Sequence, residues 1–254
     1  MVTGAAADEA AAIARSRPRL AVGLHLVLVC GRPASPPGTI PSLVRGDGSF
    51  RESPVAAGLR YQFSRRARAE LRIEIRAQLE AFRRTGLPLS HVDGHLHLHL
   101  HPVVLAILCD LAPEFSIPAV RLPAEELGPA LAFDRSAPAT KIAWAAIFRL
   151  LRRHGERRMC EARIVFADRV YGLFQTGRVS ERYLLSLLPR IGAGRSELYA
   201  HPALPEPGEP RNGAGAEELA ALVSPRVREA IEAQGIRLAT YGRFGEAAGP
   251  AAAG

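Results

Sequence analysis

The sequence predicts an α/β fold organised around a parallel sheet. Short apolar segments rich in Val and Leu alternate with longer amphipathic segments along the whole chain, and Gly, Pro, Ser or Asp marks most of the changes between them. With 254 residues, the chain is long enough to bury one α/β core. We therefore expect a single (β/α)-barrel-like domain over residues 1–246 and a flexible Ala/Gly/Pro tail at 247–254.

The first elements lead from the N-terminus to a long loop. Residues 7–16 predict a helix, and LAVGLHLVLV at 20–29 is short and apolar, as is typical of a buried strand. The segment 31–50 contains too many Gly and Pro residues for regular structure and is long enough to be a substrate-binding loop or lid. Because a (β/α) barrel begins with a strand, a chain that opens on a strand remnant and a helix predicts that the first βα unit is absent.

The middle and the end of the chain continue the alternation. Ser64 and Gly86 bound a long amphipathic helix, and LSHVD at 89–93 predicts the next strand. Pro102 is expected to open a helix that Pro113 closes. The remaining expected elements are strands at 119–122, 163–168, 196–200 and 236–241, and helices at 139–153, 181–188 and 225–234, the last bracketed by Ser224, Pro225 and Gly235.

The composition limits the classes of partner. The formal net charge is +8, but the arginines are spread over helical segments, where they are expected to form solvated faces, so we expect no nucleic-acid partner. A basic surface is compatible with peripheral contact with an anionic membrane. Without a signal peptide or an apolar run long enough to span a bilayer, the sequence predicts a cytoplasmic protein. The three cysteines form no CxxC pair and are expected to be buried free thiols.

The stretch SHVDGHLHLHLHP, residues 90–102, has a histidine at every second position from His95 to His101, and His91 and Asp93 share the same parity. A strand would place all of them on one face, but usual strand lengths and Pro102 predict that the strand ends near Asp93. The later histidines then occupy the loop after the strand, where catalytic groups of barrel enzymes gather. Since imidazole and carboxylate groups suit divalent transition metals, the stretch predicts a metal or catalytic site. A metal-buffering segment without turnover is the alternative.

Two further histidines occupy comparable places. His25 interrupts the apolar strand at 20–29, where a buried imidazole needs either a hydrogen-bond partner or a chemical task. His201 follows the strand predicted at 196–200 and precedes a Pro-rich loop. No P-loop, GxGxxG, GxSxG or HExxH motif occurs, so nucleotide-phosphate and serine-hydrolase sites have no support.

Three motifs occur together: GLHLVL around His25, SHVDGHLHLH around Asp93 and His95, and ELYAHPA around His201. In this order they resemble the YdjC-like carbohydrate deacetylases, also called the chitooligosaccharide deacetylase family. The segment 22–50 looks most like the hopanoid-biosynthesis-associated branch of that family. The resemblance implies a distorted (β/α) barrel similar to that of polysaccharide deacetylases. It also implies removal of an N-acetyl group from an N-acetylglucosamine-containing substrate, which in that branch is an N-acetylglucosaminyl hopanoid lipid.

The resemblance also implies roles for single residues. A divalent metal, Mg²⁺ or Zn²⁺, would have His25 and His95 as its histidine ligands. Asp93 would orient an imidazole, and His201 would protonate the leaving amine or stabilise the oxyanion. These assignments make His25 and His95 the expected metal ligands, and Asp93 and His201 the expected catalytic residues.

His97 and His99 would border the substrate. The sequence departs from the family in lacking the T-A-D-D-F-G-like motif that supplies the metal-binding aspartate, which agrees with the predicted absence of the first βα unit. Two alternatives follow from this departure. The alternatives to an active deacetylase are a catalytically impaired remnant of such an enzyme and an amidohydrolase-type hydrolase in which His95 and His97 form an HxH ligand pair.

Overall fold

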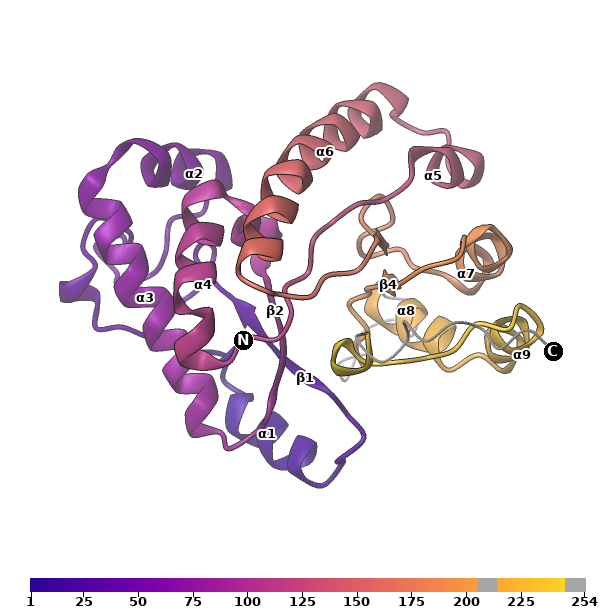
Figure 1. Cartoon of the computed structure of the whole chain (residues 1–254), viewed down its shortest axis with the longest axis horizontal. Helices are drawn as coiled ribbons and strands as arrows, with labels where there is room; N and C mark the ends of the chain where they lie inside the picture. The colour runs from indigo at the N-terminus through magenta and orange to yellow at the C-terminus, as the bar shows by residue number, and fades with distance from the viewer. Residues whose placement is uncertain (205–213, 245–254) are drawn as a thin grey trace. The chain divides into compact units, whose positions relative to one another are not determined.

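The computed structural model describes residues 1–204 and 214–244, which divide into two compact units (Figure 1). Unit 1 comprises Met1–Arg121, Arg153–Phe166 and Thr240–Gly254, and unit 2 comprises Leu122–Arg152 and Ala167–Ala239. Helices predominate, and the named strands of the described residues form two parallel pairs, so the predicted α/β class is confirmed. Barrel closure, the absence of a first βα unit and a single domain stay predictions. The predicted tail at 247–254 lies outside the described residues.

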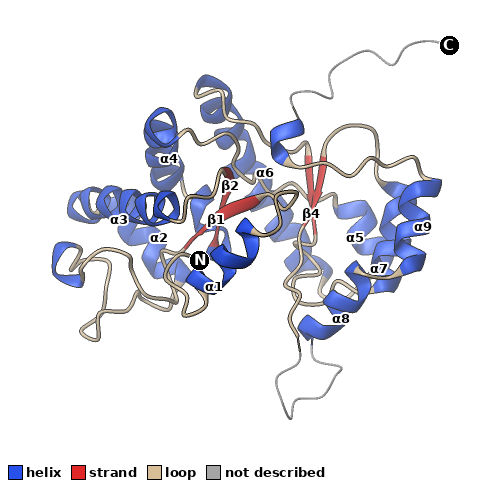
Figure 2. Cartoon of the chain, turned by 90° about the horizontal axis from the view of Figure 1, so that it is seen from below, coloured by secondary structure: helices blue, strands red, loops and turns tan. Residues whose placement is uncertain are grey.

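A parallel sheet forms the centre of unit 1. Strand β1 (Val22–Leu26) pairs with β2 (Leu89–Gly94), and Figure 2 shows the two strands side by side. Beyond β2, isolated parallel bridges join Val92 to Val120 and Ala119 to Val165. The strands predicted at 119–122 and 163–168 therefore contribute to the same sheet, but only through single bridges.

The helices of unit 1 cover this sheet and are α1 (Ala7–Arg15), α2 (Pro54–Phe63), α3 (Arg65–Arg84) and α4 (Pro102–Phe115), with 3-10 turns η1 (Pro37–Thr39), η2 (His95–Leu100) and η4 (Tyr241–Arg243). The Ser64 side chain accepts a hydrogen bond from the backbone of Ala67, which confirms the predicted N-cap of α3. The predicted end of α4 at Pro113 is wrong. The helix continues to Phe115 and ends at Ser116, whose left-handed conformation stops it.

Polar side chains on one face of α3 hold the loop at 31–50 in place. The Glu74 carboxylate accepts backbone hydrogen bonds from Ala34 and Ser35 at 2.8 and 2.9 Å, and Glu70 accepts from the Ser42 backbone at 2.8 Å. The loop also buries the apolar side chains of Ile40, Leu43, Val44 and Phe50. The loop is therefore a packed part of unit 1, because its backbone groups and its apolar side chains both find partners there.

Unit 2 contains a second parallel pair and several helices. Strands β3 (Arg169–Tyr171) and β4 (Ser196–Leu198) accompany α5 (Leu127–Phe133), α6 (Pro138–Glu161, shared with unit 1), α7 (Glu181–Leu187), η3 (Leu188–Arg190), α8 (Ala214–Leu222) and α9 (Pro225–Ala233). Its core is formed by Tyr171, Val179, Tyr183, Leu184, Leu187, Leu188, Ala221 and Val227. The strand predicted at 236–241 is wrong: these residues are mostly exposed and lack a described partner strand, and Tyr241 begins η4.

The cysteines and the helix lengths test two further expectations. Cys30, Cys109 and Cys160 are free, as predicted, but the prediction of burial is wrong, since Cys30 and Cys160 are exposed and Cys109 is half-buried. Among the described residues, no helix combines the length and the apolar character needed to cross a membrane.

Candidate functional site

The register of β1 and β2 creates the candidate site. His25 pairs with Asp93 across the two strands, and each is the next-to-last residue of its strand. The Nδ1–H group of His25 donates to Oδ1 of Asp93 at 2.9 Å. Arg121, which follows the bridge residue Val120, donates to the other carboxylate oxygen of Asp93. Ligand sites of parallel sheets lie at the carboxyl ends of the strands, and this Arg–Asp–His chain is formed there.

Asp93 is held in its ionised form. The carboxylate is buried, which by itself would raise its pKa. The hydrogen bond from His25 and the positive charge of Arg121 outweigh burial and hold the pKa of Asp93 well below its ordinary range. In a neutral imidazole, an ionised Asp93 fixes the proton of His25 on Nδ1 and leaves the lone pair on Nε2.

The histidine segment folds into η2 and does not form a continuous strand face. Leu96 and His97 both have left-handed backbone conformations, with φ of 49° and 56°, which are strained for residues with a side chain. This double turn separates the rings that strict alternation would align. The His95 ring packs edge-on against His25 with centroids 5.8 Å apart, whereas His97 packs near His99 at 6.0 Å.

His99 is buried and His97 is half-buried, and both rings favour the neutral form. Burial lowers the pKa of His97 to about 3 and that of His99 to about 4. Nε2 of His99 donates to the backbone carbonyl of Arg121 at 2.9 Å. Gly94 makes room for this ring, since a Cβ there would lie 2.9 Å from Nδ1 of His99. His99 thus supports the backbone of Arg121, and the predicted substrate contact of His97 and His99 stays a prediction.

The two outer histidines of the stretch serve packing. The ring of His91 stacks on Tyr241 at a centroid distance of 4.9 Å, and a Cβ at Gly23 would lie only 2.6 Å from the His91 ring. The His101 side chain caps the start of α4 and meets the ring of Tyr61 edge-on at 5.9 Å. The alternating histidines are therefore divided between the site and the packing of unit 1.

His201 lies in unit 2, three residues after β4. Its backbone N–H donates to the buried carboxylate of Glu218, which also accepts from the backbone of Val179 at 3.0 Å. The His201 ring is exposed and packs edge-on against Tyr199, with centroids 5.7 Å apart. Its catalytic role stays a prediction.

The donor set fits a divalent ion in part. His25 offers Nε2 while its Nδ1 is held by a carboxylate, an arrangement common among metal-binding histidines, and the His95 ring lies beside it. Within residues 1–204 and 214–244, however, no three His, Cys, Asp or Glu side chains are grouped as metal ligands. A catalytic zinc usually takes three protein ligands, and these two histidines could supply only two of them.

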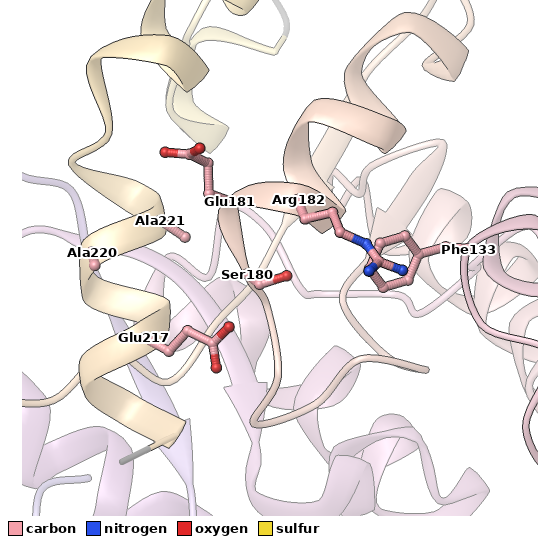
Figure 3. Close-up of a pocket in the computed structure, with 7 residues that line it drawn as sticks. All are labelled: Phe133, Ser180, Glu181, Arg182, Glu217, Ala220 and Ala221. Carbon is pink, nitrogen blue, oxygen red and sulfur yellow. The ribbon is translucent and has the colours of Figure 1, made fainter. Parts of the chain in front are cut away.

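Sequence reasoning missed Arg121 and a pocket in unit 2. Arg121 was visible only as one arginine in a predicted strand. The pocket, of about 550 Å³, is shown in Figure 3, where Arg182 extends toward the ring of Phe133. The two groups form a cation–π contact at 5.2 Å. The pocket is lined by Phe133, Ser180, Glu181, Arg182, Glu217, Ala220 and Ala221, and none of these is an imidazole or a thiol. The histidine cluster of unit 1 therefore remains the stronger catalytic candidate.

Together these features define an α/β protein with a partly buried Arg–Asp–His chain at the carboxyl end of a parallel sheet. Residues 1–233 match the YdjC-like protein family, and the chain belongs to this family. This match confirms the family resemblance of the three motifs. The hopanoid-associated branch stays a prediction.

Three similar proteins illustrate the match. A carbohydrate deacetylase of Geobacillus stearothermophilus is 31% identical over 245 residues, covering 94% of this chain and 82% of the relative. A chitooligosaccharide deacetylase of Serratia marcescens is 34% identical over 133 residues, covering 50% and 47%. The crystal structure of a protein described as a cellobiose-phosphate cleavage protein of Enterococcus faecalis V583 aligns with a TM-score of 0.66 at 24% identity, covering 96% of this chain and 85% of that chain, and it supports the fold alone.

Proposed function

We propose that this chain is a metal-dependent carbohydrate deacetylase that hydrolyses the acetamide group of an N-acetylglucosamine-containing substrate. Membership of the YdjC-like family and the names of the relatives support a sugar deacetylase. The hydrogen-bonded chain of Arg121, Asp93 and His25, with the His95 ring beside His25, supports locating the active site at the carboxyl end of the sheet in unit 1.

The reaction adds the oxygen of water to the acetamide carbonyl carbon, breaks the C–N bond and releases acetate and a free amine. Mg²⁺ or Zn²⁺, when bound, would polarise the carbonyl and lower the pKa of water. Asp93 keeps His25 in one tautomer and orientation, and Arg121 keeps Asp93 ionised. Transfer of a proton to the leaving nitrogen by His201 is a role that the family resemblance implies, and it stays a prediction. The neutral His97 and His99 add no positive charge beside the ligand pair.

For the substrate we propose an acetylated amino sugar linked to a lipid, an N-acetylglucosaminyl hopanoid being the example that the family resemblance suggests. The enzyme would then act from the cytoplasm in peripheral contact with a membrane. The formal charge of +8 supports this proposal, because inner leaflets carry anionic lipids.

Release of acetate from N-acetylglucosamine oligosaccharides, measured with added Zn²⁺ or Mg²⁺ and with a chelator, tests the proposed function. We expect metal-dependent release, and a loss of about 10–100-fold in Asp93→Asn, because the orienting partner of a metal-binding histidine is removed. Glu217→Gln in the pocket of unit 2 is the control and should retain activity.

Two outcomes would count against the proposal. Acetate release that survives Asp93→Asn but disappears with Glu217→Gln would move the reaction to the pocket of unit 2. A folded wild-type chain that releases no acetate with either metal would be the impaired remnant.

A further inference from the structure

The outer face of α2 carries an apolar stripe. Val55, Leu59 and Phe63 are 72%, 57% and 79% exposed, and their spacing of four residues places them in one row along the helix. On the inner face of the same helix, Ala57 and Tyr61 are buried. Large apolar side chains that are this exposed and adjacent are characteristic of a surface that binds a partner.

Basic side chains border this stripe at the Phe63 end. Arg65, Arg66 and Arg68 stand within the first four residues of α3, and the first turn of α3 holds no acidic residue. Cations at the start of a helix oppose its dipole. Arg66 pairs with Glu70 one turn later, and Arg68 donates to the backbone carbonyls of Tyr61 and Gln62 at the end of α2. Arg65 is exposed and forms no ion pair with the described residues, and the Arg66 side chain is 70% exposed although it contacts Glu70.

The position of α2 connects the stripe with the candidate site. The inner residue Tyr61 meets the ring of His101, which directly follows η2, and Gly58 lies beside the same ring. All of these residues belong to unit 1, and Figure 1 shows α2 beside α3 and α4. A partner that binds the outer face of α2 would therefore lie one helix away from His101, the residue that follows η2.

We infer that α2 docks on an anionic lipid bilayer, with Val55, Leu59 and Phe63 entering the headgroup region and the arginines at the start of α3 contacting lipid phosphates. This inference rests on the proposed function in that docking would bring a lipid-linked amino sugar to the histidine site. Apolar side chains that leave water and basic side chains that meet anionic headgroups are the two contributions that hold peripheral helices on membranes.

A second copy of the chain is a weaker occupant of this surface. A stable protein interface buries roughly 800 Å² per partner, and three side chains of a ten-residue helix supply only a small part of that area. A symmetric contact would also bring the arginines of two copies close together. The charge of these residues complements a bilayer and opposes self-association.

Co-sedimentation of the full-length chain with vesicles tests the inference. Wild type should bind vesicles made of phosphatidylglycerol and phosphatidylcholine in equal parts, and should bind much less to phosphatidylcholine alone. The triple variant Val55→Ser, Leu59→Ser, Phe63→Ser should bind the anionic vesicles at least about tenfold more weakly, because its apolar contacts are lost. The matched control replaces Ile142, Ile147 and Leu150, which are exposed on α6, by serine and should bind like wild type.

Equal binding by the α2 variant and wild type would overturn the inference, as would loss of binding only in the α6 control. A wild-type dimer that becomes monomeric in the α2 variant would also overturn it, by identifying a second copy as the occupant. Acetate release from a soluble oligosaccharide is measured on the same proteins and should be unchanged in the α2 variant. Failure of that reaction in wild type would count against the proposed function, whereas the vesicle result judges the α2 surface alone.

Discussion

Asp93 connects the two ends of the candidate site. One carboxylate oxygen receives the His25 ring proton and the other receives the Arg121 guanidinium. The family resemblance of the motifs implied that Asp93 would orient an imidazole. The sequence could not indicate Arg121, since that contact depends on the pairing of β2 with residues 119–120, far along the chain.

His99 gives a prediction at the scale of a residue. Its pKa falls from 6.5 to about 4 on folding, mainly through burial. Between these pH values the unfolded chain binds a proton at His99 that the folded chain does not bind, so the free energy of unfolding decreases as the pH falls. The decrease from this residue should reach roughly 3 kcal/mol near pH 4 and then level off.

Urea unfolding at pH 7.5 and at intervals down to pH 4 measures this dependence. In His99→Leu the slope of the free energy of unfolding against pH should become shallower than in wild type, even though the variant also loses the hydrogen bond to Arg121. An identical slope in the two proteins would show that His99 does not titrate as described.

At the scale of elements, local patterns predicted the parts that local interactions determine. The N-caps Ser64 and Ser224 accept backbone hydrogen bonds as expected, and Gly235 has a positive φ of 65° after α9. Helix α2 was missed because its outward face is apolar, so its segment lacks the polar side that identifies an amphipathic helix. The strand predicted at 236–241 had the right composition, but pairing depends on a neighbour that the sequence pattern cannot supply.

The contact of α3 with the loop at 31–50 gives the second prediction. Glu74→Ala should destabilise the chain by about 3 kcal/mol, because it leaves the buried backbone N–H of Ser35 and the half-buried backbone N–H of Ala34 without their acceptor. Thermal and urea unfolding measure the change. Glu80→Ala on the same helix is the control and should change stability by less than about 0.5 kcal/mol. Equal effects of the two substitutions would mean that Glu74 does not hold the loop.

At the scale of the whole molecule, the sequence predicted the α/β class and the grouping of His25, Asp93 and His95. The structure places these three residues together. The sorting of the other histidines was beyond prediction, because it depends on the left-handed turn at Leu96 and His97. Alternation suggested one face, whereas folding places His95 beside His25, sets His97 near His99, and uses His91 and His101 in packing.

The central claim is that His25 and His95 act together as the ligand pair of a single ion. Calorimetric titration of the chain with Zn²⁺ tests it most directly, with His25→Ala, His95→Ala and His97→Ala measured beside wild type. We expect one ion per chain, lost in the His25 and His95 variants and retained in the His97 variant. Loss of the ion with His97 but not with His25, or uptake of several ions regardless of His25 and His95, would contradict it.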